Sequence, residues 1–206
     1  SVPNDLGRIS QKIRFYSKNT ADELANVSIT PAHDWGQRVS VKDGFVQSGP
    51  DANGWYTYEK NYYGFEMAIV EFVIVGRVND VIIDDVELVC YDGDGSHGWA
   101  EMTGNQLADG GFEDTTRFGV AQKTNKYAME NNILSLVGDN WTDDMKKYNF
   151  AEITDVDVKT GKNALNINVA DNLPAGHYID IKMPRNDVTT VPNGMGRVSQ
   201  KIRFYS

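Results

Sequence analysis

Hydrophobic and polar residues alternate with a period of two through most of this chain. In residues 7–17 the odd positions, such as Ile13 and Phe15, share one side, and the even positions, such as Arg14, share the other. This alternation is typical of a half-buried strand. Further strands are predicted at residues 27–30, 55–58, 65–75 and 79–91, and Asp43-Gly44 in residues 37–49 predicts a hairpin.

The apolar segment at residues 79–91 carries acids on both of its faces. Asp84 shares one face with Ile82, while Asp85 shares the other with Val81 and Ile83. An acid therefore points inward in either register. A buried carboxylate needs a partner, and a metal ion is one candidate.

The second half of the chain repeats this kind of pattern. The segments concerned are residues 107–116, 141–154, 159–170 and 176–184, and only residues 129–139 suggest a short helix. Ten Tyr, eight Phe and four Trp accompany the Val- and Ile-rich runs, a composition that favours strands. Many short strands separated by Gly, Asn and Asp turns predict an all-β fold, a two-sheet antiparallel β-sandwich.

The two ends of the chain have nearly the same amino-acid sequence. The N-terminal copy is "VPNDLGRISQKIRFYS" at Val2–Ser17, and the C-terminal copy is "VPNGMGRVSQKIRFYS" at Val191–Ser206. This duplication indicates one period of a tandem array. A sandwich has one slot for this strand, so we expect one of two arrangements. Either residues 18–190 fold with one copy and leave the other redundant, or the halves complete neighbouring chains head to tail.

Charge and hydropathy exclude several classes of partner. The net charge of -9 and the pI near 4.8 argue against binding to nucleic acid, because a protein that binds nucleic acid needs a basic face. No run of about eighteen apolar residues predicts membrane insertion. Cys90, the only cysteine, is interpreted as a small buried hydrophobe.

Several short motifs, taken together, resemble carbohydrate-binding modules of the family 4/9 type. They are "NQLADGGFED" at 105–114, "TGKNALNI" at 160–167, "QKIRFYSKN" at 11–19, "GWYTY" at 54–58 and "VIIDDVELV" at 81–89. Their order is circularly rotated relative to the family. The resemblance therefore implies that residues 1–91 are the second half of a jelly-roll repeat, residues 92–104 a linker, and residues 105–206 the first half.

The resemblance implies a jelly roll whose concave face binds a glycan. An aromatic ring stacks on the apolar C–H face of a sugar, while polar side chains bind its hydroxyls. The aromatic candidates are Tyr178, Trp35, Trp55 and Trp141. For Trp55 and Trp141, packing at the edge of the sandwich is the alternative.

The same resemblance implies a structural calcium ion. The implied donors are the carbonyls of Gly111 and Lys162 and the carboxylates of Glu113 and Asp84, and calcium takes such oxygen ligands. Lys159 and Thr160, which precede Gly161, are not acidic, so the set departs from the family. The alternative is a Glu113 that caps backbone groups beside a solvated Asp85.

Catalytic motifs are lacking in the sequence. The three histidines form no HExxH pattern, and adjacent acids such as Asp143 and Asp144 point to opposite faces of a strand. We therefore expect a non-catalytic, glycan-binding repeat of a large secreted or cell-surface protein, bound to a polysaccharide and to neighbouring repeats. The alternative is a structural, fibre-forming repeat that assembles head to tail without sugar binding. A glycoside hydrolase fragment is the third hypothesis.

Overall fold

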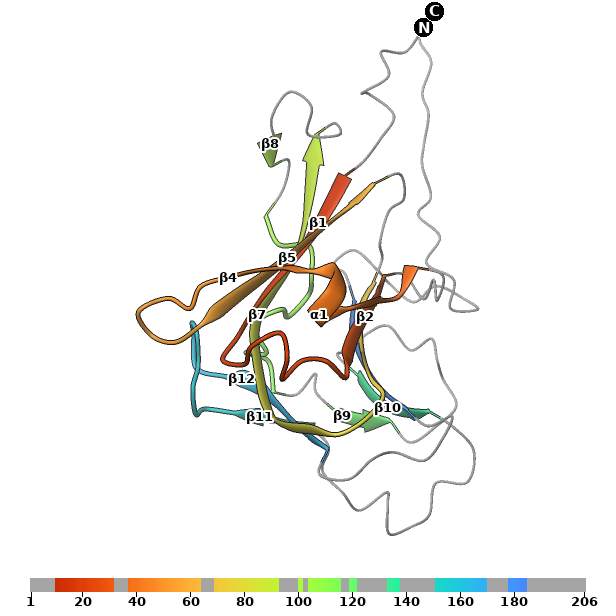
Figure 1. Ribbon diagram of the computed structural model, residues 1–206, viewed down its shortest axis with the longest axis vertical. Helices are drawn as coiled ribbons and strands as arrows, with labels where there is room; N and C mark the ends of the chain where they lie inside the picture. The colour runs from red at the N-terminus through yellow and green to blue at the C-terminus, as the bar shows by residue number, and fades with distance from the viewer. Residues whose placement is uncertain are drawn as a thin grey trace, which may run out of the picture.

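The computed structural model describes residues 10–31, 37–63, 69–92, 100–101, 104–115, 119–121, 133–137, 151–169 and 178–184. In these residues the chain forms two sheets packed face to face, which confirms the predicted β-sandwich (Figure 1). No helix in this part of the chain has the length and apolar character needed to cross a membrane.

The two sheets take their strands from distant parts of the sequence. Sheet A has the order β11 (Ala151–Thr154), β12 (Ala164–Val169), β7 (Val78–Asp92), β1 (Ser10–Ser17), β5 (Tyr56–Tyr63), β4 (Val46–Ser48), and β8 (Ala100–Glu101) pairs with β7. Sheet B has the order β3 (Val39–Ser40), β2 (Val27–Pro31), β6 (Ile69–Ile74), β13 (Tyr178–Pro184), β10 (Ile133–Val137), β9 (Gly119–Ala121). The described pairings are antiparallel except that of β9 with β10. Residues 1–91 and 105–206 both contribute strands to both sheets.

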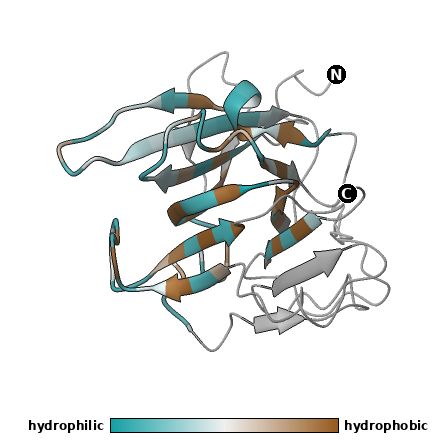
Figure 2. Cartoon of the chain, turned by 60° about the horizontal axis from the view of Figure 1, so that its bottom comes forward, coloured by the Kyte–Doolittle hydropathy of each residue, from teal (hydrophilic) through white to brown (hydrophobic). Residues whose placement is uncertain are grey.

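The core lies between the sheets and is built around Phe15. The Phe15 ring stacks on Tyr58 at 5.0 Å between ring centres and meets the edges of Phe72 and Phe45 at 5.4 and 5.7 Å. Strands of both sheets alternate hydrophobic and hydrophilic residues along their length (Figure 2). The hydrophobic positions of the alternation therefore face inward, and their side chains fill the space between the sheets.

A β-bulge in β7 resolves the conflict over which acid points inward. Arg14 of β1 pairs with Glu87, and Tyr16 pairs with Asp84, so two residues of β7 lie opposite Phe15 alone. Asp85 adopts a φ of 45° there. Because the bulge shifts the alternation by one residue, the apolar residues on both sides of it face the core, namely Val81, Ile83, Val86 and Leu88. The prediction that one register holds throughout residues 79–91 is wrong.

The predicted hairpin around Asp43-Gly44 is also wrong. β3 pairs with β2 in sheet B, whereas β4 pairs with β5 in sheet A. The chain crosses between the sheets through one helical turn, α1 (Val41–Gly44). Val41 and Phe45 are buried on either side of this crossing, and their burial outweighs the local preference of Asp-Gly for a hairpin turn.

The short helix expected at residues 129–139 is not formed in the part that the structure describes. Ile133–Val137 is the strand β10, which pairs with β13 and with β9. Pairing with two neighbouring strands overrides a weak local helix preference.

Candidate functional site

Two polar clusters stand out among the described residues. The first, named here the carboxylate turn, consists of Asp84, Asp85, Glu113 and residues 159–163. The Asp84 side chain is fully buried, and its Oδ2 accepts the backbone N–H groups of Lys159 at 2.7 Å and Thr160 at 3.4 Å. Its Oδ1 accepts the N–H of Asp85 at 2.7 Å. The turn between β11 and β12 is therefore fastened to the bulge of β7.

Glu113 holds the other side of the same turn. Its Oε1 accepts the backbone N–H groups of Lys162 at 2.8 Å and Asn163 at 3.1 Å. Asp85 Oδ1 accepts the hydroxyl of Thr160 at 2.9 Å. Three carboxylates from two segments thus surround one turn and bind its donors, and such charge-assisted hydrogen bonds to N–H groups are strong.

Burial dominates the electrostatics of Asp84. It raises the pKa of Asp84 to about 6, and the nearby Asp85 carboxylate acts in the same direction, while the donated N–H groups oppose the rise. The charged form is disfavoured by desolvation and is made tolerable by these hydrogen bonds.

The segments named for calcium do come together, but the groups around their carboxylates are N–H donors. Asp84 and Glu113 both bind this turn, which contains Lys162, and a side chain built on Gly111 would lie 3.5 Å from Asp85 Oδ1. Calcium needs several oxygen ligands on one ion. Within the described ranges no group of three or more His, Cys, Asp or Glu side chains is arranged to hold a metal. In this arrangement the residues do not form an oxygen cage, and the calcium ion stays a prediction.

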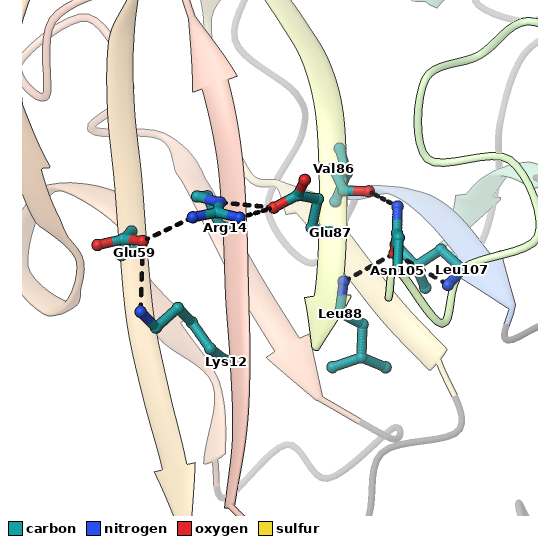
Figure 3. Close-up of polar contacts among 8 residues, drawn as sticks. All are labelled: Lys12, Arg14, Glu59, Val86, Glu87, Leu88, Asn105 and Leu107. Atoms are coloured by element: carbon teal, nitrogen blue, oxygen red, sulfur yellow. Dashed lines mark hydrogen bonds and ion pairs between the residues drawn. The ribbon is translucent and has the colours of Figure 1, made fainter. Parts of the chain in front are cut away.

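Asn105 helps to place the segment that carries Glu113 beside β7. Its side chain accepts the N–H of Leu88 at 3.0 Å and donates to the carbonyl of Val86 at 2.8 Å (Figure 3). The N–H of Val86 donates to the carbonyl of Gly110 at 2.9 Å. A side chain at Gly110 would lie 1.9 Å from the Val86 carbonyl oxygen, so glycine is required for the "GGFE" segment to dock on β7.

The second cluster is the outer face of sheet B, named here the polar face. It consists of Ser28, Thr30, Glu71, Tyr178, Asp180 and Lys182. These residues alternate along β2, β6 and β13 with residues of the core, so they point away from it. The register places Thr30 beside Glu71 and Glu71 beside Lys182. Apart from Tyr178, which is half-buried, each is at most 6% exposed.

Ion pairs connect the centre of the polar face. Lys182 Nζ lies 3.5 Å from Glu71 Oε1 and 3.5 Å from Asp180 Oδ2. Burial, followed by the neighbouring Glu71 carboxylate, raises the pKa of Asp180 to about 8. Burial likewise raises the pKa of Tyr178 to about 12. The raised pKa favours the protonated form of Asp180, which can donate a hydrogen bond.

Thr30 Oγ1 and Asp180 Oδ1 of the polar face are buried and have no hydrogen-bond partner within the described part of the chain. A buried polar atom without a partner is costly.

The aromatic residues expected to bind sugar do not form one group in the described residues. Tyr178 lies at the start of β13 on the polar face. Trp55 is 3% exposed in the turn before β5. Its backbone N–H donates to Asp51 Oδ1 at 2.9 Å, and Lys18 Nζ lies 5.1 Å from the centre of its ring. This is the packing alternative considered for Trp55, and sugar contact there stays a prediction. Trp35 and Trp141 lie outside the described residues.

Sequence reasoning did not single out Thr30, Glu71, Asp180 and Lys182. A signal was present, since Asp180 and Lys182 share a strand face with Tyr178 and Glu71 interrupts an apolar run. Their grouping depends on the order of β2, β6 and β13 in sheet B, which no local pattern encodes.

Comparisons with protein-family models, curated proteins and solved structures find no match to this chain. The two polar clusters are therefore interpreted from their own geometry and chemistry.

Proposed function

We propose that this chain is a non-catalytic, glycan-binding β-sandwich repeat of a large secreted or cell-surface protein, and that the polar face carries its binding site. The observation that carries the proposal is the buried row of hydroxyl, carboxyl and ammonium groups across β2, β6 and β13, with Tyr178 at its end. Such groups bind sugar hydroxyls, and an aromatic ring covers the apolar side of a sugar.

The charge balance of the polar face supports a neutral polysaccharide as the ligand. Lys182 balances the charge of Glu71, and the raised pKa of Asp180 favours its neutral form. A face that is close to neutral offers no strong attraction to a polyanion. Hydroxyl groups, which both donate and accept, match Thr30 Oγ1 and Asp180 Oδ1 equally well.

Affinity electrophoresis in gels that contain soluble polysaccharides tests the proposal. We expect retardation of the wild-type chain, and a loss of retardation in Tyr178→Ala, which removes the ring. Thr30→Val keeps the shape of the buried side chain and removes only the hydroxyl. We expect it to weaken binding at least tenfold while its melting temperature is unchanged or higher, because its unpaired oxygen no longer has to be buried.

Lys12→Ala on sheet A is the matched control and should bind as the wild type does. Binding that is equal in the wild type, Thr30→Val and Tyr178→Ala would reject the polar face as the site. No retardation by any polysaccharide would reject glycan binding altogether. Release of new reducing ends from a bound polysaccharide would favour a glycoside hydrolase instead.

A structural, fibre-forming repeat is the second candidate function. The observation in its favour is that β1 fills a central position of sheet A, while an identical eight-residue segment, Ser199–Ser206, occurs again in the same chain. A duplicated core strand has no role in sugar binding.

A further inference from the structure

The position of β1 forms a closely matched slot between β5 and β7. Each residue from Ser10 to Ser17 pairs with β5, and all but Phe15 pair with β7. Ile13 and Phe15 are fully buried on the inner side. On the outer side Arg14 forms ion pairs with Glu59 and Glu87 (Figure 3). The slot therefore selects its strand by backbone, by apolar shape and by charge.

The chain contains a second segment whose sequence satisfies every one of these demands. Ser199–Ser206 reads SQKIRFYS, the same eight residues as β1. Phe204 corresponds to Phe15, and Arg203 corresponds to Arg14. Since the residues are identical, the core contacts and ion pairs of the slot are open to either strand with the same energy.

The C-terminal copy begins close enough to reach the slot of its own chain. β13 ends at Pro184, which pairs with Ile69, while the slot opens where Ser10 pairs with Tyr63. Six residue steps from Tyr63 to Ile69 span at most about 22 Å, and two strand spacings add about 10 Å. Residues 185–198 reach roughly 45 Å when extended. The path is therefore longer than the distance to be covered.

The N-terminal copy is also held by residues that lie outside the slot. Asn19, which follows it, accepts the N–H of Ile82 through its side chain at 3.0 Å and the hydroxyl of Tyr58 through its carbonyl at 2.8 Å. Lys18 donates to the carbonyl of Asn53 at 2.8 Å. Lys18 and Asn19 follow the N-terminal copy directly, and these hydrogen bonds help to hold β1 in place.

We propose that the slot between β5 and β7 is a docking site for the chain's own Ser199–Ser206, which exchanges with β1. The two identical segments compete for one position, and the hydrogen bonds of Asn19 help to hold the N-terminal copy there. Whichever strand is displaced presents an unpaired edge that fits the same slot in another copy of the chain. This inference makes the second candidate function specific and is independent of sugar binding, so each can fail without the other.

Matched alanine variants in the two copies test the proposal. Phe204→Ala should melt as the wild type does, because β1 fills the slot. The decrease in melting temperature caused by Phe15→Ala should be less than half of the decrease caused by the double variant Phe15→Ala/Phe204→Ala. The reason is that Phe204 replaces the missing ring in the single variant. Equal losses in the single Phe15→Ala and the double variant would overturn the proposal, as would complete unfolding of Phe15→Ala.

Disulfide trapping tests directly whether Ser199–Ser206 occupies the slot. Lys12 pairs with Asn61, so Lys201 of the C-terminal copy would pair with Asn61 after exchange. In a Cys90→Ala background, we expect Lys201→Cys/Asn61→Cys to form a disulfide within one chain, at least threefold more in the presence of Asn19→Ala. Light scattering should show a monomer. A disulfide between chains, or a dimer, would overturn docking within the chain and assign the slot to a second copy, and absence of the disulfide would overturn both.

Discussion

At the scale of single residues, Asp84 shows how backbone N–H groups accommodate a buried carboxylate in this sandwich. Its two oxygens accept backbone N–H groups from Lys159, Thr160 and Asp85. The acid therefore organises the turn at residues 159–163 and is more than a tolerated charge.

Glycine is required in that turn for two separate reasons, and a pair of variants separates them. Gly161 has a φ of 71°, and a side chain there would lie 2.1 Å from Glu113 Oε1. Gly54 has a φ of 81°, but a side chain there would meet only Lys18 Nζ at 3.9 Å. We expect Gly54→Ala to lower the free energy of unfolding by about 1 kcal/mol through left-handed strain. Gly161→Ala should cost about 2 kcal/mol more, since it also displaces a hydrogen-bonded carboxylate. Urea unfolding measures both, and equal costs would contradict the role of Glu113.

Asp180 makes stability depend on pH in an uncommon direction. Its pKa is raised from 3.8 to about 8 by burial beside Glu71, so between about pH 4 and pH 8 the folded chain holds a proton that the unfolded chain has released. The free energy of unfolding therefore falls as the pH rises through this window. Asp84, with a pKa of about 6, acts with the same sign but stops contributing above about pH 7.

The substitution Asp180→Asn should remove this effect. We expect the melting temperature of the wild type to decrease from pH 7 to pH 8.5 and that of Asp180→Asn to stay level, while Asp84→Asn should retain the wild-type slope in that range. Thermal unfolding followed by circular dichroism gives the slopes. A wild-type slope of zero, or an unchanged slope in Asp180→Asn, would show that Asp180 does not ionise in this pH range.

At the scale of elements, the bulge in β7 decides which residues form the core. It lets Val81 and Ile83 face inward before the bulge and Val86 and Leu88 face inward after it. The left-handed backbone of Asp85 is the point at which the alternation shifts. It also turns the Asp85 side chain toward Thr160, so one local irregularity connects the core to the carboxylate turn.

Substitutions at Asp85 test the bulge. Asp85→Asn keeps an oxygen for the Thr160 hydroxyl and tolerates a positive φ, so we expect a change within about 0.5 kcal/mol. Asp85→Val removes the acceptor and places a branched side chain at a positive φ, which should cost about 2–3 kcal/mol. Denaturant midpoints give the difference. A Val variant as stable as the Asn variant would mean that the strand can shed its bulge.

At the scale of the whole molecule, the halves on either side of residues 92–104 are not separate units in the described structure. β12 of the second half pairs with β7 of the first, and β13 lies between β6 and β10. The carboxylate turn and the polar face therefore exist only when both halves are folded together. One cooperative unfolding transition is the consequence.

Chelation distinguishes a calcium-bound carboxylate turn from one held by hydrogen bonds alone. If the N–H groups around Asp84 and Glu113 alone hold the carboxylates, the melting temperature should be the same in excess EDTA and in excess calcium. A ligand that binds only the folded chain would raise the melting temperature by mass action. A fall of several degrees in EDTA that is abolished by Glu113→Gln would restore the calcium ion predicted from the family resemblance.

What the sequence determined by itself is local and periodic. Alternation predicted the strands around Ile13, Val27 and Tyr58, and the predominance of strands predicted the sandwich. The repeated sequence showed that the segment of β1 occurs twice in the chain. The tertiary structure decided the bulge at Asp85, the crossing between sheets at Val41–Gly44, and the meeting of Thr30, Glu71 and Lys182. The physical reason is that a period-two pattern records which side of a strand is buried, whereas strand order and register depend on packing between residues far apart in the chain.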